Sequence, residues 1–143
     1  MAGGTGRPLG RIAAFWDTSA LLALIFQEPH TARAQKAAAE ADMAYAWWWL
    51  EVEAWSGVLR RGGNEAQKSA CRRALGAMAW VNFQRDKTEA LLRFNEKHSL
   101  RAADAGHLFC FRELGVAVKG LTLVSFDVEM VTAAKREGLA VYD

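Results

Sequence analysis

The fold is decided by residues 12–22, which read IAAFWDTSALL. The first five residues are apolar and predict a short buried strand, while the apolar run over residues 20–26 predicts a helix. Between them stands Asp17, and a carboxylate is rarely buried unless it is paired or binds a metal. In open α/β sheets, ligands bind at the carboxyl ends of central strands. Asp17 is therefore a candidate ligand-binding residue, although this stretch alone leaves open a purely structural helix N-cap.

The length and composition predict one folded domain. The chain has 143 residues, of which 52% are hydrophobic and 24% are charged, so it can bury a substantial core. Disorder is expected only in residues 1–10, where four glycines and one proline predict a flexible N-terminal arm. Residues 11–143 are expected to form a single domain.

The sequence predicts a cytoplasmic protein. Its longest apolar run, residues 12–26, is too short to span a membrane and carries Asp17 in its middle. The same carboxylate argues against the core of a signal peptide. Cys71 and Cys110 lie far apart and lack the spacing of metal ligands, so we expect free thiols.

Segments that predict helices alternate with segments that predict strands along the rest of the chain. Asn64 and Ser99 are expected to cap the helices that follow them, and Gly115 to end the second of these helices. The alternation predicts an α/β fold with a mostly parallel sheet of four or five strands, covered by helices on both faces. We expect helices over residues 30–42, 50–61, 64–80, 87–98, 100–114 and 128–137, and strands over residues 43–49, 81–84, 121–126 and 139–142.

Four acidic residues interrupt stretches that are otherwise apolar. Asp17 and Asp127 each end a predicted strand, and parallel strands place their carboxyl ends at one edge of the sheet. Glu53 and Asp104 lie inside helices with largely apolar neighbours. Each acid alone could be a helix cap or a solvated side chain, but four such interruptions together indicate a shared site.

A shared site of this kind predicts a divalent cation. Four converging carboxylates repel one another and cannot all stay ionised unaided. Carboxylate oxygens with water suit Mg²⁺ or Mn²⁺, and no cluster of His and Cys offers a zinc alternative. The sequence does not decide between one and two ions. Glu51 is a rival for Glu53, which we prefer because of its spacing to Ser56 and Arg60.

Four blocks follow one another along the chain at regular spacings. They are residues 17–21 (DTSAL), Glu53 with Arg60 seven residues later, residues 100–108 (LRAADAGHL), and residues 123–127 (LVSFD) followed by residues 133–141. These blocks resemble the signature blocks of PIN-domain ribonucleases, and the bacterial toxins of VapC type are the most similar group. The resemblance extends over residues 12–142. It implies a three-layer α/β/α fold and metal-dependent, endonucleolytic hydrolysis of RNA phosphodiester bonds.

The resemblance also assigns residue roles and partners. It implies that Ser19 and Thr18 are hydroxyl neighbours of the site, and that the protein is bound by a small antitoxin and pairs as a homodimer. Two departures stand out, because residues 47–49 are all Trp where a small polar residue is common, and Gly106 replaces a larger apolar residue. Carried over by position, the residues that bind the metal are Asp17, Glu53, Asp104 and Asp127, and the expected catalytic residues are these four together with Ser19.

Basic residues are concentrated in two successive predicted helices. Such a patch can follow an RNA backbone, although each residue singly could belong to a solvated face. His107 and the three tryptophans are expected to be packed rather than to contact RNA. The predicted RNA-binding residues are Arg60, Arg61, Lys68, Arg72 and Arg73.

Two other functions fit the pattern less well. A phosphoaspartyl receiver or phosphatase would need adjacent acids after the first strand, where Thr18 and Ser19 stand. A catalytically silent PIN-like module that binds RNA or protein is the main alternative, and a metal titration would distinguish it. We therefore expect a ribonuclease that depends on Mg²⁺ or Mn²⁺ and is the toxin of a toxin–antitoxin pair.

Overall fold

The computed structural model describes residues 11–143, so the arm predicted for residues 1–10 lies outside the described residues. The described residues form a sheet of four parallel strands in the order β3-β2-β1-β4. A further parallel bridge joins Leu123 to Val141, which reduces the strand predicted over residues 139–142 to one pairing beside β4. The predicted α/β fold is confirmed. The strands are β1 (Ile12–Trp16), β2 (Ala41–Trp47), β3 (Ala79–Val81) and β4 (Leu121–Val124).

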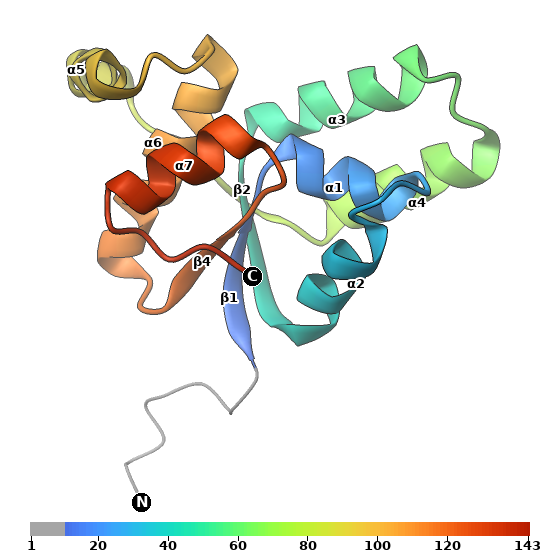
Figure 1. The fold of residues 1–143 in the computed structure, drawn as a ribbon. Coiled ribbons are helices and arrows are strands. Elements are labelled where there is room, and N and C mark those ends of the chain that lie inside the picture. The colour runs from blue at the N-terminus through green and yellow to red at the C-terminus, as the bar shows by residue number, and fades with distance from the viewer. Residues whose placement is uncertain (1–10) are drawn as a thin grey trace, which may run out of the picture.

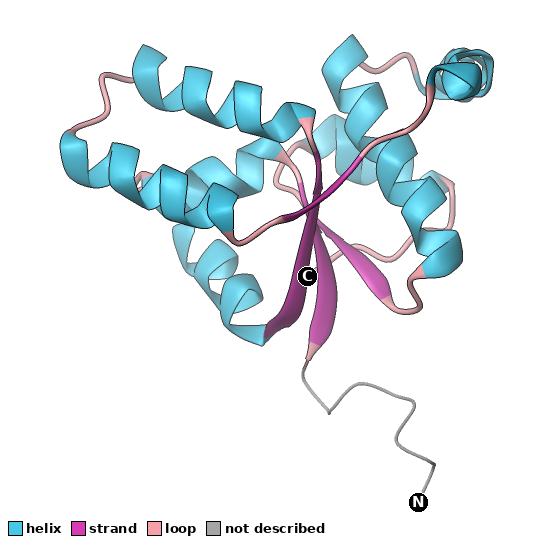
Figure 2. Cartoon of the chain, turned by 180° about the vertical axis from the view of Figure 1, so that it is seen from behind, coloured by secondary structure: helices cyan, strands magenta, loops and turns pink. Residues whose placement is uncertain are grey.

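The central strand β1 sends its side chains alternately into two hydrophobic cores. Ala13 and Phe15 belong to one core and Ala14 and Trp16 to the other, and all four are buried. The first core is covered by α5 (Thr88–His98), α6 (Ala102–Ala117) and α7 (Val128–Arg136). The second core is covered by α1 (Thr18–Ile25), α2 (Thr31–Glu40), α3 (Trp49–Arg60) and α4 (Glu65–Gly76). Figures 1 and 2 show the two groups of helices on opposite sides of the sheet, which is a three-layer α/β/α arrangement.

The tryptophan-rich segment does not form one buried strand, as had been predicted for residues 43–49. β2 begins at Ala41 and ends at Trp47, whose pairing with Val81 is the last in the β2–β3 ladder. Trp48 has helical backbone angles, and Trp49 opens α3. The side chain of Trp48 is 41% exposed. Aromatic residues favour strands in general, but here the edge strand β3 is too short to extend the ladder further.

The segment after α3 was predicted correctly in type and incorrectly in its boundaries. Asn64 caps α4 as expected, because its side chain accepts a hydrogen bond from the backbone N–H of Gln67 at 2.8 Å. The helix ends at Gly76 rather than near Trp80. Trp80 lies in β3, where it pairs with Ala46. The edge strand therefore lies two residues earlier than predicted, and the 3₁₀ turn η1 (Arg85–Lys87) leads from it to α5.

Ser99 ends α5 instead of capping α6. Its φ of 52° lies in the left-handed region, which is uncommon for residues other than glycine and typical of the end of a helix. The Asn95 side chain stabilises this turn by bonding both the N–H and the carbonyl of Leu100, at 2.8 and 2.9 Å. α6 then begins at Ala102 and runs through Gly115, which places Asp104 in its first turn.

Two further expectations concern the chain as a whole. Cys71 and Cys110 are free and buried, as predicted. None of the helices formed by residues 11–143 combines the length and the apolar character needed to cross a membrane.

Candidate active site

Asp17 lies at the junction of β1 and α1 and is 3% exposed. One carboxylate oxygen, Oδ1, accepts hydrogen bonds from the backbone N–H of Ala20 at 3.0 Å and from the Ser19 hydroxyl at 2.8 Å. The other, Oδ2, accepts a hydrogen bond from the Ser125 hydroxyl at 2.7 Å. Burial raises the pKa of Asp17, and these three hydrogen bonds oppose that shift. Asp17 is thus an N-cap, and its carboxylate is also fixed in orientation by two serines.

The two serines connect Asp17 to the loop that follows β4. The Ser19 Oγ accepts a hydrogen bond from the Phe126 N–H at 3.0 Å. The Ser125 Oγ accepts one from the Asp127 N–H at 3.1 Å. Each hydroxyl therefore donates to the carboxylate and accepts from the loop, so the end of β1 and the end of β4 form one hydrogen-bonded unit.

Asp127 repeats at β4 the position that Asp17 has at β1. It is the N-cap of α7, and its Oδ1 accepts a hydrogen bond from the Met130 N–H at 3.0 Å. Because β1 and β4 are parallel neighbours, their carboxyl ends and these two acids lie at the same edge of the sheet.

Glu53 reaches the same region from α3. Its Oε1 accepts a hydrogen bond from the Thr18 hydroxyl at 2.8 Å and pairs with the His107 Nε2 at 2.5 Å. The His107 side chain is 1% exposed, whereas that of Glu53 is 27% exposed. Burial acts to raise the pKa of Glu53, but the hydrogen bond and charge of His107, with the Thr18 hydroxyl, bring it below its ordinary value. Glu53 is therefore held as a carboxylate with one open side.

A large aromatic side chain supports His107 from behind. The Trp47 ring meets the His107 ring edge to face, with centroids 5.1 Å apart. The same indole lies directly on Gly106, where an added Cβ would collide with it. Its Nε1 donates to the Asn82 side chain at 3.0 Å. The two departures noted in the sequence thus compensate for each other, because the missing side chain at Gly106 makes the space that Trp47 fills.

Asp104 shows that the four carboxylates converge. Its pKa is raised from 3.8 to about 6, first by burial and then by the negative charges of Asp127, Asp17 and Glu53, while His107 acts in the opposite direction. Three other acids are therefore close enough to Asp104 to disfavour its ionised form. The four predicted acids lie together at the carboxyl edge of the sheet.

The donor set fits a hard divalent cation. It consists of carboxylate and hydroxyl oxygens, and the repulsion felt by Asp104 is the kind of imbalance that a positive charge removes. With the side chains in their present positions, no three His, Cys, Asp or Glu residues among residues 11–143 are close enough together to hold a metal ion. Asp17 bonds Ser19 and Ser125, Asp127 bonds the Met130 N–H, and Glu53 pairs with His107, so these three carboxylates each have a partner within the protein.

The predicted RNA-binding residues belong to α3, α4 and the turn between them, which form the α3–α4 hairpin that extends from the sheet in Figure 1. Arg61 pairs with Glu28 at 2.9 Å. The guanidinium of Arg72 lies 4.5 Å from the centre of the Trp55 ring. Glu51 is exposed and lines a groove on this hairpin, so it does not share the contacts of Glu53.

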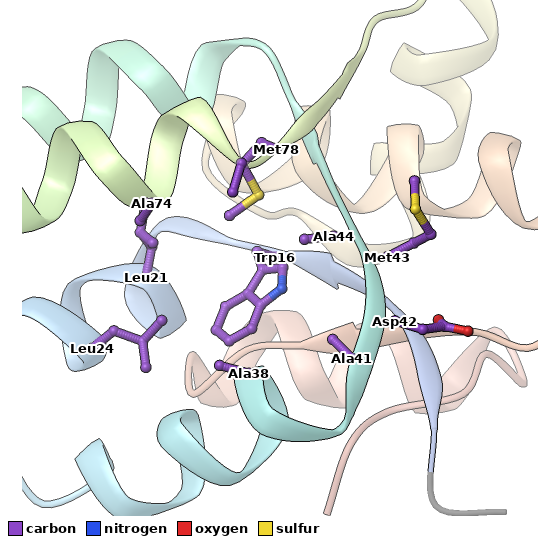
Figure 3. A pocket seen from close by; sticks show the side chains of 11 residues that line it. Trp16, Leu21, Leu24, Ala38, Ala41, Asp42, Met43, Ala44, Ala74 and Met78 are labelled. Carbon is purple, nitrogen blue, oxygen red and sulfur yellow. The ribbon is translucent and has the colours of Figure 1, made fainter. Parts of the chain in front are cut away.

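An apolar cavity of about 370 Å³ lies apart from the carboxylates, none of which lines it (Figure 3). Trp16 lies at its centre and is surrounded by side chains of α1, α2, α4 and β2. The Trp16 Nε1 has no hydrogen-bond partner among the described residues. Asp42 is the one acid that lines the cavity, so this cavity lacks the groups needed for hydrolytic chemistry.

Two contributors to the site were missed in the sequence. Ser125 was read only as part of a strand, although a polar residue within an apolar run two positions before Asp127 was a usable signal. His107 was expected to be packed, which is correct, but its pairing with Glu53 was not anticipated. Its spacing of three residues from Asp104 on one helix indicated a shared face.

Comparisons with known proteins identify the family and the structures that this chain is similar to. The PIN domain model matches residues 14–136. A comparison with curated proteins found no match. Several solved structures are similar in fold. Among them, PAE2754 from Pyrobaculum aerophilum has 18% identity and a TM-score of 0.62, and the match covers 92% of each chain. The sarcin–ricin loop cleaving toxin VapC20 of Mycobacterium tuberculosis has 21% identity and a TM-score of 0.67, over 85% of this chain and 95% of that chain. A toxin–antitoxin complex from Klebsiella pneumoniae has 20% identity and a TM-score of 0.59, over 81% of this chain and 88% of that chain. The family model covers most of the sequence and the fold agrees with it, so the chain belongs to the PIN domain family.

Proposed function

We propose that this protein is an endoribonuclease that hydrolyses RNA phosphodiester bonds and depends on Mg²⁺ or Mn²⁺. The observation that carries the proposal is the convergence of four carboxylates at the carboxyl edge of a PIN-domain sheet, where burial, and then the negative charges of the other three acids, raise the pKa of Asp104 to about 6. The fold is similar to that of a toxin that cleaves the sarcin–ricin loop, which supports RNA as the substrate.

The four acids would hold the cation, directly or through water. Asp17 keeps a fixed orientation because Ser19 and Ser125 hold both its oxygens. When bound, the cation supplies positive charge that polarises the phosphate and acidifies the attacking water. Glu53 stays ionised at neutral pH because its pKa is lowered, so its open side can accept a hydrogen bond from that water.

The proposal extends to partners. The likeness in fold to a toxin–antitoxin complex supports a role as the toxin of such a pair, bound by a small antitoxin. A homodimer and a cytoplasmic location belong to the same proposal. Arg60, Arg61, Lys68, Arg72 and Arg73 would follow the RNA backbone along the α3–α4 hairpin.

Cleavage of a labelled stem-loop RNA tests the proposal. Purified protein is incubated with the RNA in EDTA, and then with Mg²⁺ or Mn²⁺ in excess, and the products are separated on a denaturing gel. We expect defined internal cuts with either metal and none in EDTA. Asp17→Asn, purified in parallel, is the control for contaminating nuclease and should not cut. Equal cutting by wild type and Asp17→Asn would contradict the proposed site.

A further inference from the structure

A second cavity lies beside the loop that carries Asp127. It has a volume of about 230 Å³ and is lined by residues of α2, α7, the β4–α7 loop and the end of the chain. Figure 1 shows the C-terminal residues between α7 and α2. Ser125 and Phe126 form one wall of the cavity. Nothing in the proposed chemistry of the four acids uses this space.

That wall is shared with the active site. The Ser125 hydroxyl donates to Asp17 at 2.7 Å, and the Phe126 N–H donates to Ser19 at 3.0 Å. The cavity and the carboxylates are therefore separated by one short loop. A strand of nucleic acid that places one phosphate at the carboxylates would place a neighbouring phosphate within reach of the cavity.

Aromatic and basic side chains meet on the loop. The His30 ring stacks on the Phe126 ring with centroids 4.6 Å apart and an angle of 13° between the planes. The Arg33 guanidinium lies over the same ring, 5.0 Å from its centre. These contacts hold a guanidinium at the rim, where its planar donors remain free to form paired hydrogen bonds with a phosphate.

Two basic side chains line the cavity. Lys135 of α7 lines it together with Arg33, and Asp143 is the one acid that lines it. Within residues 11–143, neither Arg33 nor Lys135 forms an ion pair with a carboxylate. By contrast, Arg61 on the α3–α4 hairpin is paired with Glu28. Four carboxylates repel an RNA strand, so unpaired cations beside them are needed to bring the strand close.

From this geometry we infer that the α2–α7 cavity is a phosphate subsite for the RNA strand, with Arg33 and Lys135 as the residues that hold it. The inference rests on the proposed RNA cleavage and adds a contact surface on α2 and α7 to the one proposed on the α3–α4 hairpin.

A pair of matched double variants tests this subsite. Arg33→Ala/Lys135→Ala removes both cations that line the cavity. Lys36→Ala/Arg136→Ala removes one exposed cation from each of the same two helices, outside the cavity, with the same change in net charge. Binding of a fluorescent 12-nucleotide single-stranded RNA is measured in EDTA at two salt concentrations, and cleavage of the same RNA is measured in Mn²⁺.

The cavity variant should bind the RNA at least about tenfold more weakly than the control variant does. The slope of its binding constant against salt concentration, on logarithmic axes, should become shallower by the equivalent of about two phosphate contacts. Its KM should rise while kcat at saturating RNA stays close to that of the wild type, since the carboxylates are untouched. If the cavity variant does not fold, Arg33→Gln and Lys135→Gln singly provide the same comparison with less loss of packing.

The outcomes separate the two proposals. Equal weakening of both double variants, with wild type still cutting RNA, would overturn the subsite and leave the nuclease standing. Wild-type protein that neither binds nor cuts RNA in Mn²⁺ would overturn the proposed function and the subsite together.

Discussion

The two sides of the four-carboxylate cluster are held in place by different kinds of side chain. On the β1–β4 side, Asp17 is held by two serine hydroxyls and by the Ala20 N–H at the start of α1. On the β2 side, Glu53 is held by His107, which packs against the large ring of Trp47. The first side depends on short hydrogen bonds near the strand ends. The second depends on the packing of bulky side chains that come from three separate elements, so its geometry is more sensitive to changes in volume.

The largest expected effect is a difference in cleavage rate between variants of the two glutamates of α3. Glu53→Gln removes a proposed metal ligand and its pairing with His107, so we expect kcat in Mn²⁺ to fall by roughly 100-fold or more. Glu51→Gln is the matched control in the same helix and should leave cleavage unchanged, because that side chain is exposed on the hairpin. A greater loss in Glu51→Gln would mean that the aromatic side of the site does not serve catalysis.

Ser125→Ala tests the hydroxyl side. The change leaves Asp17 Oδ2 without its partner, and removing a residue that orients a metal ligand typically lowers metal affinity by about 10- to 100-fold. The lost hydrogen bond lowers the pKa of Asp17 in the wild type, so its removal raises that pKa and should shift Mn²⁺ binding to higher pH. Calorimetric titration at two pH values measures both effects. Ser56→Ala, on the exposed face of α3, should behave as wild type. Unchanged affinity and pH dependence in Ser125→Ala would show that Asp17 needs no such support.

Gly106→Ala tests the packing side through stability. The added methyl group collides with the Trp47 ring, and overpacking of this kind costs about 1–3 kcal/mol in the free energy of unfolding. Gly115→Ala is the control in the same helix, where an added Cβ meets nothing within 4 Å. It should leave stability unchanged or raise it by about 0.5–1 kcal/mol, because Ala favours helices over Gly. Urea denaturation of both variants gives the comparison, and equal behaviour would refute a tight Trp47–Gly106 contact.

The smallest effect concerns Asp104, whose ionised form is disfavoured by burial and by the carboxylates on both sides of the site. Its pKa is about 6 in the folded protein and has an ordinary value of 3.8, so folding favours the protonated form. Its ionisation therefore destabilises the fold as the pH rises from about 4 to above 6. In EDTA, Asp104→Asn should be more stable than wild type at pH 8 by about 1 kcal/mol, a value reduced by solvent screening of this partly exposed group.

The two proteins should have the same stability near pH 4, where Asp104 is largely protonated. Thermal melts across this range measure the difference. A variant that melts lower than wild type at pH 8 would mean that Asp104 stabilises the fold through a partner.

The sequence predicted those features that depend on local pattern. The apolar run before Asp17 and the alternation of helices with strands were enough for the parallel sheet and its two covered faces. The four acids could be found because each interrupts an apolar stretch. Asn64 was recognised as a cap because Asn favours the position before a helix, and its side chain accepts a hydrogen bond from the Gln67 N–H.

The features that were missed depend on particular contacts, most of them between distant parts of the chain. His107 pairs with a glutamate 54 residues earlier, and no local pattern contains that contact. Ser125 bonds a carboxylate 108 residues earlier. The three tryptophans were read as one strand because aromatic residues favour strands, but the short partner strand β3 ended the ladder at Trp47. Ser99 favoured a helix start by composition, whereas the side chain of Asn95 fixed the turn that ends the preceding helix.

The contact between Trp47 and Gly106 has a consequence for how such a chain can change over generations. A larger residue at position 106 collides with the indole while Trp47 is present, and a smaller residue at position 47 leaves a void over Gly106. Either substitution alone is therefore destabilising, whereas the two together restore the packed volume. The two positions should therefore covary. Relatives are expected to carry either a large residue at position 47 with Gly at position 106 or the reverse combination.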